Sequence, residues 1–199
     1  MMNYLRFTKQ INFIKEIDKL KHVMRSSILL SGERRENTAE HCWHVAVMSM
    51  LLCEYANEPV DQVKVMKMLI IHDIIEIESG DTYVYDTVGL QDQEEREIKA
   101  ADKLFSMLPD DQNREFRDLW NEFEAKKSHE SKFAKAIDRL MPLLHNIGTD
   151  GEVWLENDIH VNQVMELMSQ GIAEGSEELW SYAKNIIDDS VTKGWLRND

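Results

Sequence analysis

Hydrophobic residues recur at three- and four-residue steps along most of the chain, which is the period of an amphipathic helix. In the first such segment they are Phe7, Ile11, Ile14, Ile17 and Leu20. The pattern predicts seven or eight helices. Their approximate bounds are 3–24, 37–57, 61–78, 93–108, 110–125, 128–144, 158–169 and 177–193. Ser176 is expected to cap the last of these helices.

Residues at the expected helix ends support this segmentation. Asn37 and Glu40 have the spacing of a capping box, which marks the start of a helix. Pro142 is expected to kink the helix that contains it. Residues 25–35 break the helical period and include a Ser-Gly pair, so we predict a loop there. Residues 79–92 form a second loop, long enough to suggest a function.

The composition agrees with a helical protein. Hydrophobic residues make up 43% of 199 residues, enough for one domain with a sizeable core. Eight glycines and three prolines are few for an all-β protein rich in turns. We therefore predict a single all-α domain over residues 1–199.

Charge and cysteine content narrow the class of function. A net charge of −14 argues against binding to a nucleic acid polymer, because phosphate contacts need clustered Lys and Arg. Cys42 and Cys53 match no metal or redox spacing. The first ten residues lack the apolar core of a secretion signal, and no apolar run approaches membrane-spanning length. We expect a soluble, cytoplasmic protein without a membrane partner.

The stretch Leu69–Asp81 carries ionisable residues inside an apolar run. His72, Asp73 and Glu76 lie among isoleucines, and Asp81 follows a glycine. A helix that is apolar nearly all round is buried. Buried carboxylates are costly unless they are paired or bind a metal. A divalent cation is the simplest common explanation for these groups.

Such a cation needs ligands from several helices. Neighbouring helical residues point about 100° apart, so His72 and Asp73 can flank one point only near the helix surface. Further ligands must then come from other helices. His41, in the first turn of the second helix, and Asp138, inside the sixth, are best placed to supply them. Two imidazoles and two carboxylates suit Mn, Co, Fe, Ni or Zn better than Ca. We therefore predict one divalent transition metal as cofactor.

Four motifs in this order resemble those of the HD-domain metal-dependent phosphohydrolases, and within them the branch of small 5′-deoxynucleotidases. They read E-H-C-W-H-V-A at 40–46, H-D-I-I-E at 72–76, G-D at 80–81 and K-A-I-D-R-L around Asp138. The resemblance covers about residues 15–147 and implies an HD-domain helical bundle, with the helices of residues 158–193 packed on it. It makes His41 the metal ligand, and His44 is the alternative that the sequence leaves open.

The same resemblance implies roles around the metal. Glu76 is expected to orient the attacking water or accept its proton, and Asp81 to protonate the leaving oxygen or hold the sugar. Arg25 matches the family's phosphate-binding arginine, and Arg34 and Arg35 are the next candidates. Relatives commonly follow that arginine closely with a tryptophan, whereas this chain has the Ser-Ser-Ile of residues 26–28.

The implied function is hydrolysis of small phosphomonoesters, with deoxyribonucleoside 5′-monophosphates as the expected substrates. The loop 79–92 offers Tyr83 and Tyr85 for stacking on a base, and Asp81 and Asp86 for sugar hydroxyls. One alternative is a metal-stabilised module that binds a nucleotide without turnover, which would not need Glu76 and Asp81. Another is a phosphodiesterase that acts on cyclic or longer nucleotides. The acidic net charge and the single HD motif argue against this alternative.

A homodimer is also expected. Family members of this size commonly pair, and aromatic residues are enriched at protein interfaces. Three tryptophans near the end of the sequence provide such area: Trp154, Trp180 and Trp195.

Overall fold

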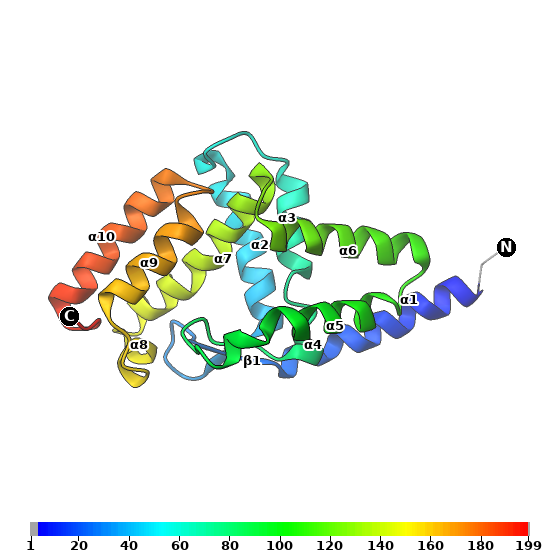
Figure 1. The fold of residues 1–199 in the computed structure, drawn as a ribbon, viewed down its shortest axis with the longest axis horizontal. Coiled ribbons are helices and arrows are strands. Elements are labelled where there is room, and N and C mark those ends of the chain that lie inside the picture. Colours follow the sequence, from blue (N-terminus) through cyan, green and yellow to red (C-terminus); the bar gives the residue numbers. More distant parts are fainter. Residues whose placement is uncertain (1–3, 199) are drawn as a thin grey trace.

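The computed structural model of the chain describes residues 4–198 and is almost entirely helical (Figure 1). Residues 1–3 and 199 lie outside it, and so does the predicted start of the first helix at residue 3. The helices of ten or more residues are α1 (Tyr4–Glu16), α2 (Thr38–Leu52), α3 (Gln62–Ile71), α5 (Gln93–Phe105), α6 (Asp110–Ala125), α7 (His129–Gly148), α9 (Val161–Ile172) and α10 (Glu177–Lys193). The all-α prediction is confirmed.

Shorter elements connect these helices. Two are brief α-helices, α4 (Glu76–Ser79) and α8 (Glu152–Glu156). Three are 3-10 turns: η1 (Ile17–His22), η2 (Cys53–Tyr55) and η3 (Gly89–Gln91). The first helix therefore ends earlier than predicted and tightens into η1 before a change to extended backbone at Met24.

The predicted loop at residues 25–35 is wrong in part, because this segment belongs to a hairpin. Strand β1 (Met24–Ile28) pairs antiparallel with β2 (Arg35–Asn37), and Gly32 occupies the left-handed region, with φ +73°, in the turn between them. Both strands are short, and burial along β1 increases towards one end instead of alternating. The period-two signal of a strand is therefore missing from the sequence.

The predicted third helix is also interrupted. Helix α3 ends at Ile71, and a tight turn runs from His72 to the start of α4 at Glu76. Within it the backbone makes three-residue hydrogen bonds, from Ile74 N–H to the Ile71 carbonyl at 3.1 Å and from Glu76 N–H to the Asp73 carbonyl at 3.0 Å. Such bonds tighten the backbone relative to an α-helix.

Helix α7 lies at the centre of the arrangement and contacts α2, α3, α6, α9 and α10. Its buried face carries Phe133, Ile137, Leu140 and Met141, and it continues through Pro142 to Gly148. The last two long helices pack against it and against each other, as expected for residues 158–193. Helix α10 begins with the predicted cap, in which the Ser176 hydroxyl accepts a hydrogen bond from a backbone N–H.

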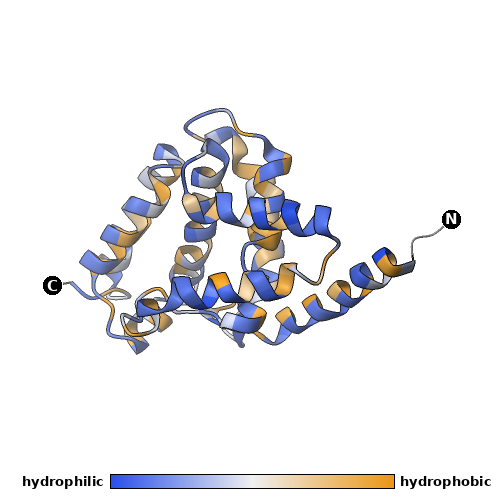
Figure 2. Ribbon diagram, turned by 45° about the vertical axis from the view of Figure 1, so that its right-hand side comes forward, coloured by the Kyte–Doolittle hydropathy of each residue, from blue (hydrophilic) through white to orange (hydrophobic). Residues whose placement is uncertain are grey.

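Two hydrophobic clusters fill the interior. One is built around α7 and the C-terminal helices, and the other joins α1 and η1 to α5 and α6. Helix α3 contributes Met68 and Leu69 to the first cluster and Ile71 to the second. In Figure 2 the hydrophobic colour accordingly gathers on α2 and α3 in the middle of the molecule, whereas α6 is mostly hydrophilic. His72 therefore lies where the two cores meet.

Among residues 4–198, none of the helices has the length and hydropathy that crossing a lipid bilayer requires.

Candidate active site

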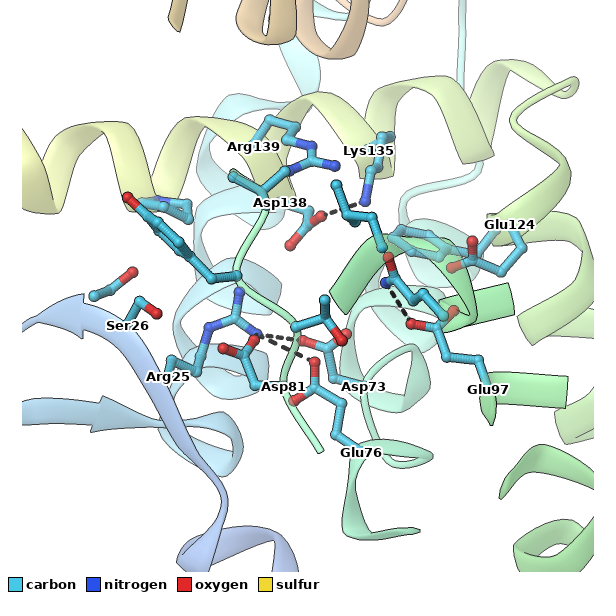
Figure 3. A pocket seen from close by; sticks show the side chains of 18 of the residues that line it. Arg25, Ser26, Asp73, Glu76, Asp81, Glu97, Glu124, Lys135, Asp138 and Arg139 are labelled. Carbon is cyan, nitrogen blue, oxygen red and sulfur yellow. Dashed lines mark hydrogen bonds and ion pairs between the residues drawn. The ribbon is translucent and has the colours of Figure 1, made fainter. Parts of the chain in front are cut away.

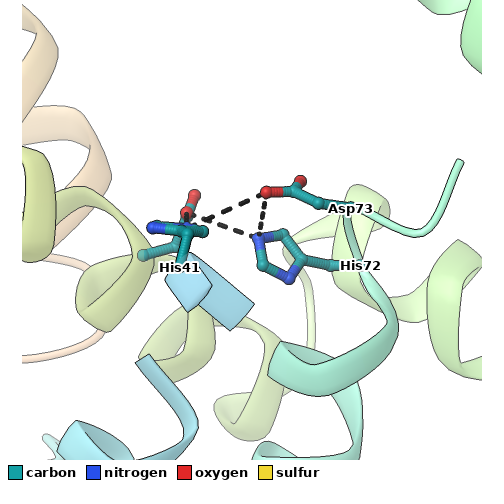
Figure 4. Close-up of side chains that lie close together, drawn as sticks. His41, His72 and Asp73 are labelled. Atoms are coloured by element: carbon teal, nitrogen blue, oxygen red, sulfur yellow. Dashed lines mark hydrogen bonds and ion pairs between the residues drawn. The ribbon is translucent and has the colours of Figure 1, made fainter. Parts of the chain in front are cut away.

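Four ionisable side chains converge from three helices at this junction. His41 comes from the first turn of α2, His72 and Asp73 from the end of α3 and the turn after it, and Asp138 from α7 (Figure 4). His41 Nε2 lies 3.1 Å from Asp138 Oδ1, and His72 Nε2 lies 3.1 Å from Asp73 Oδ2. One donor atom from each residue falls within 4.8 Å of all the others.

The capping box explains why His41 faces inward. The Asn37 side chain accepts a hydrogen bond from Glu40 N–H at 3.0 Å, and Asn37 N–H donates to the Glu40 carboxylate at 2.9 Å. Both bonds satisfy backbone groups that the first helical turn leaves open. The turn is thereby fixed, and His41 is completely buried.

The donor set fits a divalent transition metal. His72 Nδ1 lies 2.9 Å from the Leu69 carbonyl, so in the neutral ring Nδ1 carries the proton and Nε2 has the lone pair. That Nε2 atom is buried and makes no hydrogen bond. Two imidazole nitrogens and two carboxylates form a mixed N/O set of the kind that Mn, Co, Fe, Ni or Zn accepts.

Arg25 of β1 extends into the same group of charges. Its Nη1 lies 2.7 Å from Asp73 Oδ2, 3.5 Å from Asp81 Oδ1 and 3.8 Å from Glu76 Oε1 (Figure 3). Burial lowers the pKa of Arg25, but the carboxylates around it, Asp73 first, raise that pKa by more. The pKa of Asp73 is lowered, because attraction from His72 and Arg25 exceeds the opposing effect of burial. The hairpin thus places a permanent cation beside the candidate ligands.

Glu76 and Asp81 also lie beside Arg25. The Thr38 hydroxyl donates to Glu76 Oε2 at 2.8 Å, so Oε1 is the oxygen that faces the arginine. Burial and the neighbouring Asp73 raise the pKa of Glu76 well above its usual range, and burial raises the pKa of Asp81.

A cavity of about 730 Å³ is lined by Arg25, Asp73, Glu76, Asp81 and Asp138. Tyr83 and Tyr85 contribute to its wall, with ring centroids 5.3 Å apart in an edge-to-face arrangement. Lys135 and Arg139 of α7 lie on the opposite side of the cavity from Arg25 (Figure 3).

Other sequence candidates lie outside this cavity. Arg34 pairs with Glu40, and Arg35 pairs with Glu156 at 3.0 Å. Asp86 is exposed, and its Oδ1 accepts hydrogen bonds from two backbone N–H groups of its own loop. This leaves Arg25 as the sequence-predicted arginine that faces the candidate ligands.

Sequence reasoning missed three residues that support the site. Thr38 holds Glu76, Lys135 Nζ lies 2.8 Å from Asp138 Oδ2, and Glu36 Oε2 lies 3.5 Å from His41 Nδ1. The spacing of Lys135 and Asp138 on one helix was a usable signal, since residues three apart are neighbours. Nothing in the sequence around Glu36 distinguishes it from a surface carboxylate.

His44 does not join the four-residue group. It lies instead near Glu36 and His145, on the other side of His41. Of the two histidines that the sequence left open, His41 is therefore the one placed beside His72, Asp73 and Asp138.

Comparison with known proteins places these observations in a family. The family model described as HD domain matches residues 17–180. The chain belongs to the HD domain family. Among solved structures, a predicted metal-dependent phosphohydrolase from Magnetospirillum magnetotacticum is 46% identical, with a TM-score of 0.91 over 96% of this chain and 95% of that one. The resemblance to HD-domain metal-dependent phosphohydrolases is thereby confirmed.

More distant relatives carry a more specific name. The human 5′-deoxynucleotidase HDDC2 is 27% identical over 135 residues, which are 67% of this chain and 65% of the human protein. The chain thus spans somewhat less than two thirds of that relative's length. The 5′-deoxynucleotidase hdd1 of Schizosaccharomyces pombe is 23% identical over 99% of this chain and 91% of its own length.

Proposed function

We propose that this HD-domain protein hydrolyses deoxyribonucleoside 5′-monophosphates and releases inorganic phosphate. One observation carries the proposal. The Arg25 guanidinium lies 2.7 Å from Asp73, so a phosphate-binding cation and a metal-ligand group share one end of the same cavity. The human and fission-yeast relatives named 5′-deoxynucleotidases support this choice of substrate.

In this proposal His41, His72, Asp73 and Asp138 hold one divalent transition metal, of the series Mn, Co, Fe, Ni or Zn. When bound, such a cation polarises phosphate oxygens and lowers the pKa of a water molecule towards neutrality. Arg25 binds the phosphate through the planar fork of its guanidinium, which matches phosphate oxygens in pairs.

Glu76 and Asp81 are proposed to handle protons. Glu76 is fixed by Thr38 through one oxygen, which leaves Oε1 to orient the attacking water and accept its proton. Asp81 lies 3.5 Å from the same arginine nitrogen and is placed to protonate the leaving sugar oxygen or to hold the sugar. Asp81 follows Gly80, whose φ of +74° aims the chain into the cavity.

A substrate panel tests the proposal. Metal-reconstituted protein is incubated with deoxyribonucleoside and ribonucleoside 5′-monophosphates, other phosphorylated metabolites and cyclic nucleotides, and phosphate release is measured. We expect release from the deoxyribonucleoside monophosphates. Binding without release would instead indicate a nucleotide-binding module, and opening of cyclic nucleotides would indicate a phosphodiesterase.

Arg25→Lys should slow turnover of every nucleotide by a similar factor, about tenfold or more, because the charge remains but the paired hydrogen bonds are lost. The measurement is kcat/KM across the panel. Arg34→Lys is the matched control, since Arg34 pairs with Glu40 outside the cavity, and it should change little. Unchanged rates in the Arg25 variant would mean that the phosphate is held elsewhere.

Tyr83→Leu should change the ranking among bases while affecting the phosphate step little. Stacking on an aromatic ring contributes about 1–3 kcal/mol per base and varies with the base. The measurement is the ratio of kcat/KM values among the four deoxyribonucleotides. Tyr182→Leu, at a half-exposed position on α10, is the control. An unchanged ranking in the Tyr83 variant would assign base contacts to other residues.

We also propose that the protein forms a homodimer, but through a surface other than the one that the tryptophans suggested. Trp154 is only 1% exposed, so it packs internally and offers no interface area. Exposed apolar side chains gather instead on α2 and α3: Trp43, Met50, Leu51, Val63 and Ile70. Sedimentation should give a dimer at micromolar concentration, and Leu51→Lys should shift it towards monomer. A wild-type monomer at that concentration would contradict this arrangement.

A further inference from the structure

A second group of metal-binding side chains lies behind His41, away from the cavity. It consists of Glu36 at the middle of β2, His44 one turn after His41 on α2, and His145 near the end of α7. One donor atom from each falls within 4.8 Å of the other two. The His44 and His145 rings have their centroids 6.3 Å apart, at an angle of 66°.

Two of these three residues are buried with unused polar atoms. Glu36 is 1% exposed and His145 is 2% exposed. Glu36 Oε2 and His145 Nδ1 face each other at 3.8 Å, and neither makes a hydrogen bond. A buried carboxylate oxygen without a partner is destabilising. A ligand that contacts both Glu36 Oε2 and His145 Nδ1 would satisfy these two atoms.

The neighbouring nitrogens of Arg25 and His41 do not donate a hydrogen bond to Glu36 Oε2. Arg25 Nε lies 3.8 Å from Glu36 Oε2, and His41 Nδ1 lies 3.5 Å from it. Both of these nitrogens also lack a hydrogen-bond partner. The closest carboxylate contact of Arg25 is instead with Asp73 of the first metal-ligand group, 2.7 Å from Nη1. Glu36 Oε2 thus lies 3.5–3.8 Å from nitrogens of Arg25, His41 and His145 and accepts a hydrogen bond from none of them.

We propose that Glu36, His44 and His145 bind a second divalent transition metal, distinct from the one at the active site. Two imidazoles with one carboxylate form a set that Zn, Fe, Co, Ni and Mn accept, with positions left for water. Bonds of about 2.0–2.2 Å allow two donor atoms to lie up to roughly 4.4 Å apart. The 3.8 Å between Glu36 and His145 is within that limit. His44 is half-buried, and one of its ring nitrogens lies within 4.8 Å of the donor atoms of Glu36 and His145.

The role of this second cation is structural. It would join β2, α2 and α7, and the hairpin that includes β2 also carries Arg25. Glu36 Oε2 lies 3.5 Å from His41 Nδ1 and 3.8 Å from His145 Nδ1, so a cation in the second site would also fix the carboxylate beside the His41 ring. The second site should therefore raise thermal stability and stiffen the first.

Zinc content and thermal stability test this proposal without reference to activity. The protein is loaded with Zn²⁺, dialysed against metal-free buffer and assayed for retained zinc and for Tm. Wild type should retain two equivalents, and His44→Gln should retain one and lose part of the zinc-dependent rise in Tm. The same loss is expected for His145→Gln. His22→Gln, at an exposed position in η1, is the matched control and should keep two equivalents.

Asp138→Asn separates the two sites. It removes a ligand of the first group only, so it should retain one equivalent, and adding His44→Gln should remove that as well. The proposal is overturned if wild type retains a single zinc or if His44→Gln still retains two. Either result leaves the proposed nucleotidase activity untouched, because that activity depends on the first group alone.

Discussion

Asp138→Asn is expected to abolish phosphate release and to remove one equivalent of metal from the protein. The substitution keeps the shape of the side chain but removes the charge that faces both imidazoles, with His41 Nε2 at 3.1 Å and His72 Nε2 at 3.4 Å. Substituting residues that only support the ligands of a metal lowers metal affinity or activity by about 10–100-fold. Substituting a ligand itself should therefore lower activity by more than about 100-fold. Elemental analysis and phosphate release measure the two effects.

The control is Asp118→Asn, at an exposed position on α6, which should leave both quantities unchanged. The metal assignment is wrong if Asp138→Asn retains full metal content and normal turnover. A second comparison uses chelation of wild type. Removing the metal should reproduce the loss of activity, and returning it should restore activity.

Glu76→Gln should lower turnover by about 10²–10⁴-fold while metal content stays at the wild-type level. Glutamine keeps the size of the side chain and can still accept the hydrogen bond from Thr38, but it cannot take a proton from water. Glu78→Gln is a control on the same short helix, because Glu78 pairs with Lys103 away from the cavity. Loss of metal in the Glu76 variant would make Glu76 a ligand and would reverse the division of roles.

Helix periodicity and capping chemistry could be read from the sequence because they are local. The capping box at Asn37 and the Ser176 cap appear as expected, and each depends on residues within three positions of one another. The candidate ligands were predictable for a different reason. Ionisable residues inside apolar stretches, such as His72 and Asp138, need an explanation wherever they occur. The single-domain division over residues 1–199 stays a prediction.

What was missed depends on contacts between distant segments. The turn that ends α3 at Ile71 forms inside a sequence with uninterrupted helical character, where the two cores meet. In this turn the adjacent residues His72 and Asp73 face one point, with His72 Nε2 3.1 Å from Asp73 Oδ2. Glu36 and Thr38 acquire their roles only when the hairpin brings them against α7 and α4, and no local pattern encodes that approach.

The most direct test of the central claim is phosphate release from a deoxyribonucleoside 5′-monophosphate by metal-reconstituted wild type, assayed beside Asp138→Asn and chelated wild type. The account predicts sustained release by the reconstituted protein and none above background by the other two. It is contradicted if the reconstituted protein releases no phosphate from any of the four deoxyribonucleotides. Equal release by the chelated protein would contradict it as well.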